Sequence, residues 1–169
     1  MKKTLKTLSF LTICTNILGA TPLPIKLAKE QYARAKRDVI GHHTIKTQSG
    51  LTGYEQEIAM ICQQVKDYFQ NRSVLPGDSV IFDIDETVLS NVNLSIEENF
   101  ETKRGTDTNY LFRSQARCTP IAPSIELCAW FRAKGYKVIF ITSRRDWMAG
   151  YREGTVVNLE REGVAIDAH

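Results

Sequence analysis

A short apolar run that ends in two carboxylates most constrains what this chain can fold into. Val80-Ile81-Phe82 is β-branched and aromatic, which is typical of a buried strand, and Asp83-Ile84-Asp85-Glu86-Thr87 follows it at once. A polar turn that caps a helix would account for Asp85, but it would not place an acid at the end of a buried strand. The pattern therefore predicts a catalytic site.

A calcium-binding EF-hand loop is another source of closely spaced acids. A loop of that kind beginning at Asp83 would need glycine at Val88 and glutamate at Leu94. Neither residue is present, so the EF-hand interpretation fails at two positions.

A second apolar run predicts a partner for the first strand. Val138-Ile139-Phe140-Ile141 has the same character, and a helix capped by Ser124 and ended by Gly135 precedes it. Strand, helix and strand in this order predict a parallel pair with a right-handed connection, and hence an α/β fold. Ligands bind at the carboxyl ends of such strands, so Asp83 and Thr142 are expected to share one crevice.

Three further helices are predicted from apolar periodicity. They cover about residues 27–39, 54–69 and 151–162. The polar stretch between the first two is expected to be irregular. The adjacent His42 and His43 would therefore lack the spacing of a metal-ligand pair.

Two carboxylates in this position suit phosphoryl transfer. Asp83 can attack the phosphorus of a phosphomonoester and form an aspartyl-phosphate, which divides one hard step into two easier ones. Mg²⁺ prefers carboxylate, water and phosphate oxygens, so it is the expected cofactor, with Asp83 and Asp85 as its predicted ligands. Asp85 can also protonate the leaving alkoxide and later deprotonate the attacking water. Thr87 is expected to support the turn, and Glu86 to point elsewhere.

The surrounding residues extend this pattern. The run from Val80 to Asn91, Val-Ile-Phe-Asp-Ile-Asp-Glu-Thr-Val-Leu-Ser-Asn, resembles the first motif of the haloacid-dehalogenase superfamily. More narrowly, it is similar to the secreted acid phosphatases of that superfamily, which are the bacterial class B and class C enzymes and the plant vegetative storage proteins. The stretch from Gly135 to Arg145 resembles the strand that ends in the family's second motif. The Thr-x-x-Asn-Leu pattern at 155–159 resembles the helix after it, so the resemblance covers about residues 50–165.

The resemblance implies a haloacid-dehalogenase-like (Rossmann-like) parallel sheet with flanking helices, and roles for the second motif. Thr142 would hydrogen-bond the transferred phosphoryl group, and Ser143 and Arg144 would bind the phosphate or support its binding. Residues 90–119, which lose periodicity, would form a small cap that helps to choose a small-molecule phosphomonoester. The aromatic residues of this insertion would line the cap or simply pack it: Phe100, Tyr110 and Phe112.

Two later motifs of the family are not found in this sequence. They are a lysine that pairs with the phosphoryl charge and an acidic pair that completes the metal site; here the last lysine is Lys137, and Asp167 lies on a short tail. Residues 21–169 are therefore expected to be an incomplete copy of the domain, with its C-terminal part missing. Two alternatives stay open: a noncatalytic exported protein that binds or stores, and phosphotransfer to an alcohol.

The first twenty residues predict export. Lys2, Lys3 and Lys6 precede an apolar run from Leu8 to Ile17, and small residues end it, which is the layout of a secretory signal peptide over residues 1–20. The run is shorter than a membrane-spanning helix needs. A secreted or periplasmic protein without a stable membrane span is therefore expected, with an uncleaved anchor as the alternative.

The charge balance argues against a nucleic-acid partner. The chain has 22 basic and 19 acidic side chains, and the predicted signal holds three of the lysines and no acid. The remaining chain is therefore balanced and offers no basic stripe. The oligomeric state does not follow from the sequence.

Three cysteines follow the predicted signal. In an exported protein two of them could pair, and Cys118 with Cys128 is the expected pair, because Cys62 lies on an apolar helical face. Three buried free thiols are the interpretation left open beside it.

Overall fold

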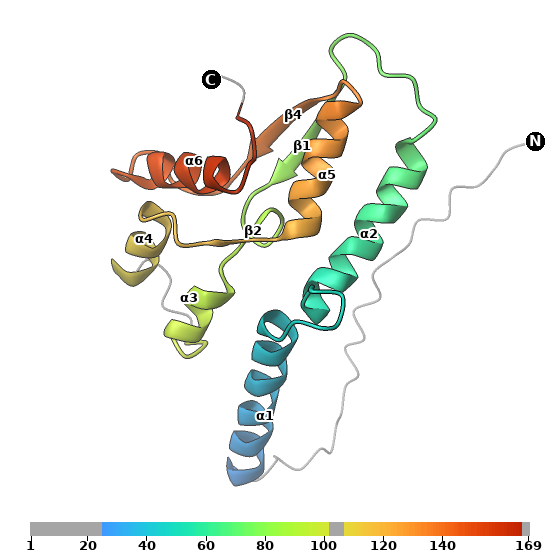
Figure 1. The fold of residues 1–169 in the computed structure, drawn as a ribbon. Coiled ribbons are helices and arrows are strands. Elements are labelled where there is room, and N and C mark those ends of the chain that lie inside the picture. Colours follow the sequence, from blue (N-terminus) through green and yellow to red (C-terminus); the bar gives the residue numbers. More distant parts are fainter. Residues whose placement is uncertain (1–24, 102–106, 167–169) are drawn as a thin grey trace, which may run out of the picture.

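The computed structural model describes residues 25–101 and 107–166, shown in Figure 1. The predicted signal peptide lies outside the described residues. The elements follow in the order α1 (Ile25–Thr44), α2 (Gly53–Phe69), β1 (Ser79–Asp83), β2 (Leu89–Ser90), α3 (Val92–Glu97), α4 (Asp107–Ser114), β3 (Thr119–Pro120), α5 (Ala122–Ala133), β4 (Lys137–Ile141) and α6 (Tyr151–Arg161).

The two predicted strands form a parallel pair. β1 and β4 align in register, with Val80 opposite Val138 and Asp83 opposite Ile141. Helix α5 connects them, and α5 and α6 lie on either side of the pair (Figure 1). The strand, helix and strand predicted from the sequence are therefore confirmed.

The start of α5 differs from the prediction. The N-cap residue is Ile121, which makes no side-chain cap hydrogen bond, and Pro123 lies in the first turn. Proline is suited to this place because its missing N–H needs no partner there. Ser124 is thus a buried helical residue rather than the cap. Gly135 does end the helix, with a φ of 94° that favours glycine.

Aromatic rings hold α2 and α5 against the strands. Phe131 of α5 lies edge-on to Phe69 of α2 and to Tyr136, with centroids 5.3 Å away in each case. Phe82 of β1 approaches Phe131 from the sheet at 6.2 Å. This packing extends along β1 as far as Phe82, the residue before Asp83, so the strand that carries Asp83 is held by the core up to its carboxyl end.

The insertion after β1 is more regular than the sequence indicated. It contains α3 and α4, and β2 pairs antiparallel with β3 at its base, where Leu89 faces Pro120 and Ser90 faces Thr119. Phe112 is buried at 1% exposure, so it packs the insertion. A mixture of acids, amides and aromatics hid these short helices, because two turns are too few for a clear period.

Helix α4 lies directly against α6. A Cβ added at Gly154 would stand 2.4 Å from the carbonyl oxygen of Ser114 and 2.5 Å from that of Arg113. No other residue fits this approach. Tyr110 of α4 also stacks on Tyr151 of α6, with ring centroids 5.4 Å apart and an interplanar angle of 14°. The insertion is therefore anchored on the helix that follows β4.

The histidine pair is helical, contrary to expectation. α1 continues to Thr44, so His42 and His43 occupy its last turn. His43 stacks on Tyr54 with centroids 4.3 Å apart, just after the capping box that Thr52 and Glu55 form at the start of α2.

Within the part of the chain that the structure describes, no helix has the length and apolarity to cross a membrane.

The cysteines are free thiols. Cys62, Cys118 and Cys128 are each buried and none is bonded to another. Cys118 lies beside Arg144, whereas Cys128 has Cys62 as its electrostatic neighbour. The expected Cys118–Cys128 disulfide is therefore wrong for this structure, and the interpretation as three buried free thiols is the one it bears out.

Candidate active site

Asp83 and Thr142 lie at the same edge of the strand pair. Asp83 is the last residue of β1 and is opposite Ile141, so Thr142 is one residue beyond that partner. The side chain of Asp83 is exposed, whereas Thr142 is half-buried. Thr142 Oγ1 accepts a hydrogen bond of 3.1 Å from the backbone N–H of Arg144. A carboxylate and a hydroxyl thus both lie at the edge where parallel strands bind ligands.

A tight loop follows Asp83. The carbonyl oxygen of Ile84 accepts from the backbone N–H groups of Val88 at 3.0 Å and Leu89 at 2.9 Å. Val88 and Leu89 are fully buried, at 0% exposure each. The loop therefore curls back onto the core within a few residues, and Asp85 lies in this loop.

Glu86 organises this loop, a role that the sequence did not indicate. Its backbone has a φ of 58°, an uncommon left-handed conformation for a residue with a side chain. Its carboxylate accepts from the backbone N–H of Asn91 at 2.6 Å and from Ser90 Oγ at 3.2 Å. Tyr54 Oη donates to its carbonyl oxygen at 3.3 Å. These bonds connect the loop after Asp83 to the start of the insertion and to α2.

Asp85 is held by a buried arginine and an amide. Arg144 donates from Nη2 to Asp85 Oδ1 at 2.7 Å and from Nε to Oδ2 at 3.1 Å. Asn91 Nδ2 donates to Oδ1 at 2.9 Å. Burial raises the pKa of Asp85, but the hydrogen bonds and charge of Arg144, aided by Asn91 and Arg113, outweigh it, so the pKa lies below its usual value.

Arg144 is itself enclosed by protein. Its side chain is 3% exposed. Besides Asp85 it donates to Thr155 Oγ1 at 2.9 Å and to Cys118 Sγ at 3.3 Å. The structure therefore places Arg144 as a support for Asp85. Ser143 is exposed, and phosphate binding by Ser143 and Arg144 stays a prediction.

One face of α6 holds both the site and the insertion. Thr155 accepts the hydrogen bond from Arg144. Asn158, one turn later, is fully buried and hydrogen-bonds the backbone of Cys118. Asn158 Oδ1 accepts from the Cys118 N–H at 3.0 Å while its Nδ2 donates to the Cys118 carbonyl at 2.9 Å. The Thr-x-x-Asn spacing is the sequence signal for this face, because residues three apart are neighbours on a helix.

An apolar cavity of about 160 Å³ borders the site on the α6 side. It reaches Thr142 and Arg144 at the edge of the sheet. Its apolar walls are contributed by β4, α6 and the loops around them: Ile84, Phe140, Val156, Leu159 and Ile166. Charged side chains also line it, namely Arg145, Asp146 and Arg152, so the cavity combines apolar walls with charged groups beside Thr142.

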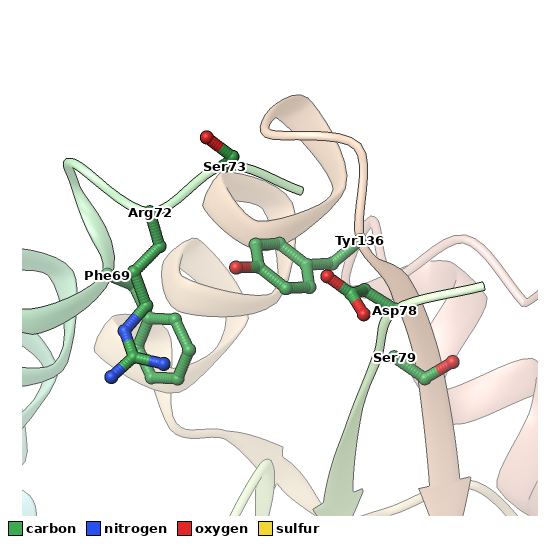
Figure 2. Close-up of a pocket in the computed structure, with 6 residues that line it drawn as sticks. All are labelled: Phe69, Arg72, Ser73, Asp78, Ser79 and Tyr136. Carbon is green, nitrogen blue, oxygen red and sulfur yellow. The ribbon is translucent and has the colours of Figure 1, made fainter. Parts of the chain in front are cut away.

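Figure 2 shows a hollow at the opposite end of the strands. Ser79 begins β1 there and Tyr136 precedes β4, so this hollow of about 370 Å³ lies away from Asp83. Arg72 lies over the ring of Tyr68 at 4.2 Å, and the Asp78 carboxylate accepts from the Leu75 N–H at 2.9 Å. Its charged groups thus have structural partners.

Asp83 is the carboxylate at this edge that is open to Mg²⁺. Within the described ranges, no group of three or more His, Cys, Asp or Glu side chains is arranged to hold a metal. Mg²⁺ usually takes one or two carboxylates, several waters and substrate phosphate oxygens. The exposed carboxylate of Asp83 fits this mode, whereas the carboxylate of Asp85 is occupied by Arg144.

Comparison with known proteins agrees with this geometry. The family described as HAD superfamily, subfamily IIIB (Acid phosphatase), matches residues 16–169. No curated protein matches the chain. Because the family match spans nearly all of the sequence, the chain belongs to the HAD superfamily acid phosphatases of subfamily IIIB, whose reaction is the hydrolysis of phosphomonoesters.

Proposed function

We propose that this protein hydrolyses small-molecule phosphomonoesters through an aspartyl-phosphate formed on Asp83. One observation carries the proposal: the exposed Asp83 carboxylate lies beside Thr142 at the carboxyl edge of the strands, and Asp85 is fixed two residues away by Arg144. A nucleophile needs to be accessible, and an acid–base partner needs to be oriented. The two carboxylates meet these separate needs.

The first step transfers the phosphoryl group to the protein. A carboxylate oxygen of Asp83 bonds to phosphorus while the bond from phosphorus to the ester oxygen breaks. The departing alkoxide takes a proton from Asp85 and leaves as an alcohol. Thr142 donates its hydroxyl to a phosphoryl oxygen.

The second step restores the carboxylate. A water oxygen bonds to phosphorus, its proton passes to Asp85, and the bond from phosphorus to Asp83 breaks. Inorganic phosphate leaves, and Asp85 again carries the proton needed for the next cycle. An alcohol in place of water would give phosphotransfer by the same residues.

Arg144 lowers the pKa of Asp85 in the free protein, so the carboxyl needs a further influence to carry a proton. A bound phosphoryl group brings negative charge next to the carboxylate and favours its protonated form. Arg144 thus keeps Asp85 ready to accept a proton, and the substrate prepares it to donate one.

Mg²⁺ fits this proposal through Asp83. Asp83, with waters and a phosphate oxygen, would hold the ion, and a backbone oxygen near Asp85 is the further ligand that remains, since Arg144 occupies the Asp85 carboxylate. When bound, Mg²⁺ neutralises charge on the phosphate.

The test is hydrolysis of a generic aryl phosphate by the purified chain with and without Mg²⁺. Asp83→Asn should abolish turnover, because an amide is a poor nucleophile at phosphorus. Asp67→Asn is the matched control, since Asp67 is an exposed carboxylate on α2 that accepts a hydrogen bond from Gln63 Nε2 at 2.8 Å. Metal-dependent turnover that survives Asp83→Asn would refute the mechanism.

A noncatalytic binding or storage protein is the second candidate. It is favoured by Lys137, which stands opposite Ser79 at the amino end of the strand pair and so lies away from Asp83. Arg144 is likewise committed to Asp85 and Thr155. Titration calorimetry with Mg²⁺ and a phosphate analogue, beside the turnover assay, separates the two: binding without turnover supports this candidate.

We also propose that the protein acts outside the cytoplasm, in the periplasm or secreted. The predicted signal peptide at residues 1–20 supports this. Fractionation of expressing cells tests it, and retention of the whole protein in the cytoplasm would contradict it.

A further inference from the structure

A second arginine reaches the Asp85 carboxylate from the insertion. Arg113 Nε lies 3.7 Å from Asp85 Oδ1 and donates to Asn91 Oδ1 at 3.3 Å. It comes from α4, whereas Arg144 comes from the loop after β4. The insertion therefore contributes a positive charge at the centre of the site.

The position of Arg113 is set by the docking of α4 on α6. The close approach at Gly154 involves the carbonyl oxygen of Arg113 itself. Asn109, one turn earlier, accepts from Arg113 Nη1 at 2.5 Å and from Tyr151 Oη at 3.4 Å. The guanidinium is thus oriented by its own helix and by α6.

The charges at this point are unbalanced. Asp85 already has a close ion pair with Arg144, so Arg113 is a second guanidinium beside one carboxylate. The side chain of Arg113 keeps 21% exposure, and its Nη2 has no hydrogen bond within the described residues. Arg113 therefore retains both charge and a donor for an incoming ligand.

We propose that Arg113 is a specificity-determining residue that binds an anionic group on the leaving alcohol of the substrate. The proposal rests on the proposed function, in which Asp85 protonates the ester oxygen. That oxygen has to come within hydrogen-bond distance of Asp85. Since Arg113 Nε is 3.7 Å from the same carboxylate, it reaches groups attached close to the ester oxygen.

The substrate class follows from the guanidinium. Its planar fork pairs with carboxylate or phosphate through charged hydrogen bonds. We therefore assign to this site phosphomonoesters that carry a carboxylate or a second phosphate one or two carbon atoms from the ester oxygen. Neutral alcohols would leave Arg113 without this contact.

Phosphoglycolate and ethyl phosphate test the assignment, because they differ in the carboxylate on the leaving group. Their dissociation constants are measured by calorimetry on the full chain carrying Asp83→Asn, so that neither ligand is consumed. We expect phosphoglycolate to bind about tenfold or more tightly than ethyl phosphate. Adding Arg113→Gln should bring the ratio close to one. Arg113→Lys should keep part of the preference, since it keeps the charge and loses the fork.

Arg117→Gln is the matched control. Arg117 follows α4, pairs with Glu97 and lies over the ring of Phe112, away from Asp85. It should keep the preference. Equal affinity of the Asp83→Asn protein for the two ligands would overturn the assignment, and this result does not depend on whether Arg113→Gln folds. If Arg113→Gln does fold, an unchanged ratio of the two dissociation constants would overturn it as well.

Wild-type turnover separates this inference from the proposed function. Hydrolysis of both esters with equal kcat/KM would overturn the inference and leave the function standing. An Arg113-dependent binding preference without any turnover would overturn the function and support the anion site. Failure of both ligands to bind would overturn the inference.

Discussion

Arg144 and Asp85 lie 59 residues apart in the chain and form a two-nitrogen ion pair, with Nη2 2.7 Å from Oδ1 and Nε 3.1 Å from Oδ2. The arginine is buried and the carboxylate faces the crevice. This pair joins the loop after β1 to the loop after β4. The orientation of the proposed acid–base residue therefore depends on the pairing of the two strands.

Removal of this arginine should destabilise the protein. Arg144→Met leaves the Asp85 carboxylate partly buried without its main partner, and we expect a loss of about 3 kcal/mol or more in the free energy of unfolding. Urea denaturation measures the loss. Arg145→Met is the control, because Arg145 is exposed and lies 5.4 Å from the ring of Trp147. Equal effects of the two substitutions would contradict a buried ion pair.

Gly154→Ala should separate α4 from α6. The added methyl group would overlap the carbonyl oxygens of Ser114 and Arg113, so helix α4 has to move. We expect a cost of about 1–3 kcal/mol in unfolding free energy. Hydrogen exchange should also speed up in residues 107–114.

Gly41→Ala provides a control of opposite sign. Gly41 is also helical, and an added Cβ would meet only Ile45 Cδ1 at an ordinary 3.5 Å. It should be neutral or stabilise by about 0.5–1 kcal/mol, because alanine is the better helix former. A destabilisation like that of Gly154→Ala would show that the methyl group costs stability without any contact with α4, and would contradict the explanation given for Gly154.

Stability should fall as the pH is lowered through the histidine range. Burial lowers the pKa of His43 below its ordinary value of 6.5; the carboxylates of Glu86 and Glu57 oppose this, and His42 adds to it. As the pH falls, His43 therefore takes up a proton in the unfolded chain near pH 6.5 but in the folded protein only at a lower pH. The free energy of unfolding decreases between these two pKa values and is constant again below the folded one.

NMR titration of the His43 ring measures this pKa directly. The His43→Gln variant should lose this part of the pH dependence of the melting temperature. A pKa at or above 6.5 would contradict the partly buried stack on Tyr54.

The thiols should resist alkylation in the native protein. Burial raises the pKa of Cys128 to about 12, with Arg132 opposing it and Cys62 adding to it, and burial also raises the pKa of Cys62 and Cys118. Little thiolate is then present at neutral pH. Mass spectrometry after iodoacetamide should show all three modified in denaturant without a reductant. A protected pair under those conditions would reveal a disulfide.

The sequence by itself determined the family and the scaffold. The strand ending in Asp83, the strand ending before Thr142 and the helix between them follow from local patterns, because apolar runs and glycine stops act over a few residues. The Asp-x-Asp spacing and the resemblance around it led to the family without any structure.

Only the tertiary structure decided how the site is held together. The resemblance implied that Arg144 binds the phosphate or supports its binding, and the structure adds its contacts with Asp85, Thr155 and Cys118. Likewise, Arg113 reaches the site because Gly154 lets α4 approach α6. Each of these contacts joins parts of the chain that lie far apart. Local periodicity carries no information about which of several arginines ends beside a given carboxylate, so the folded arrangement alone settles it.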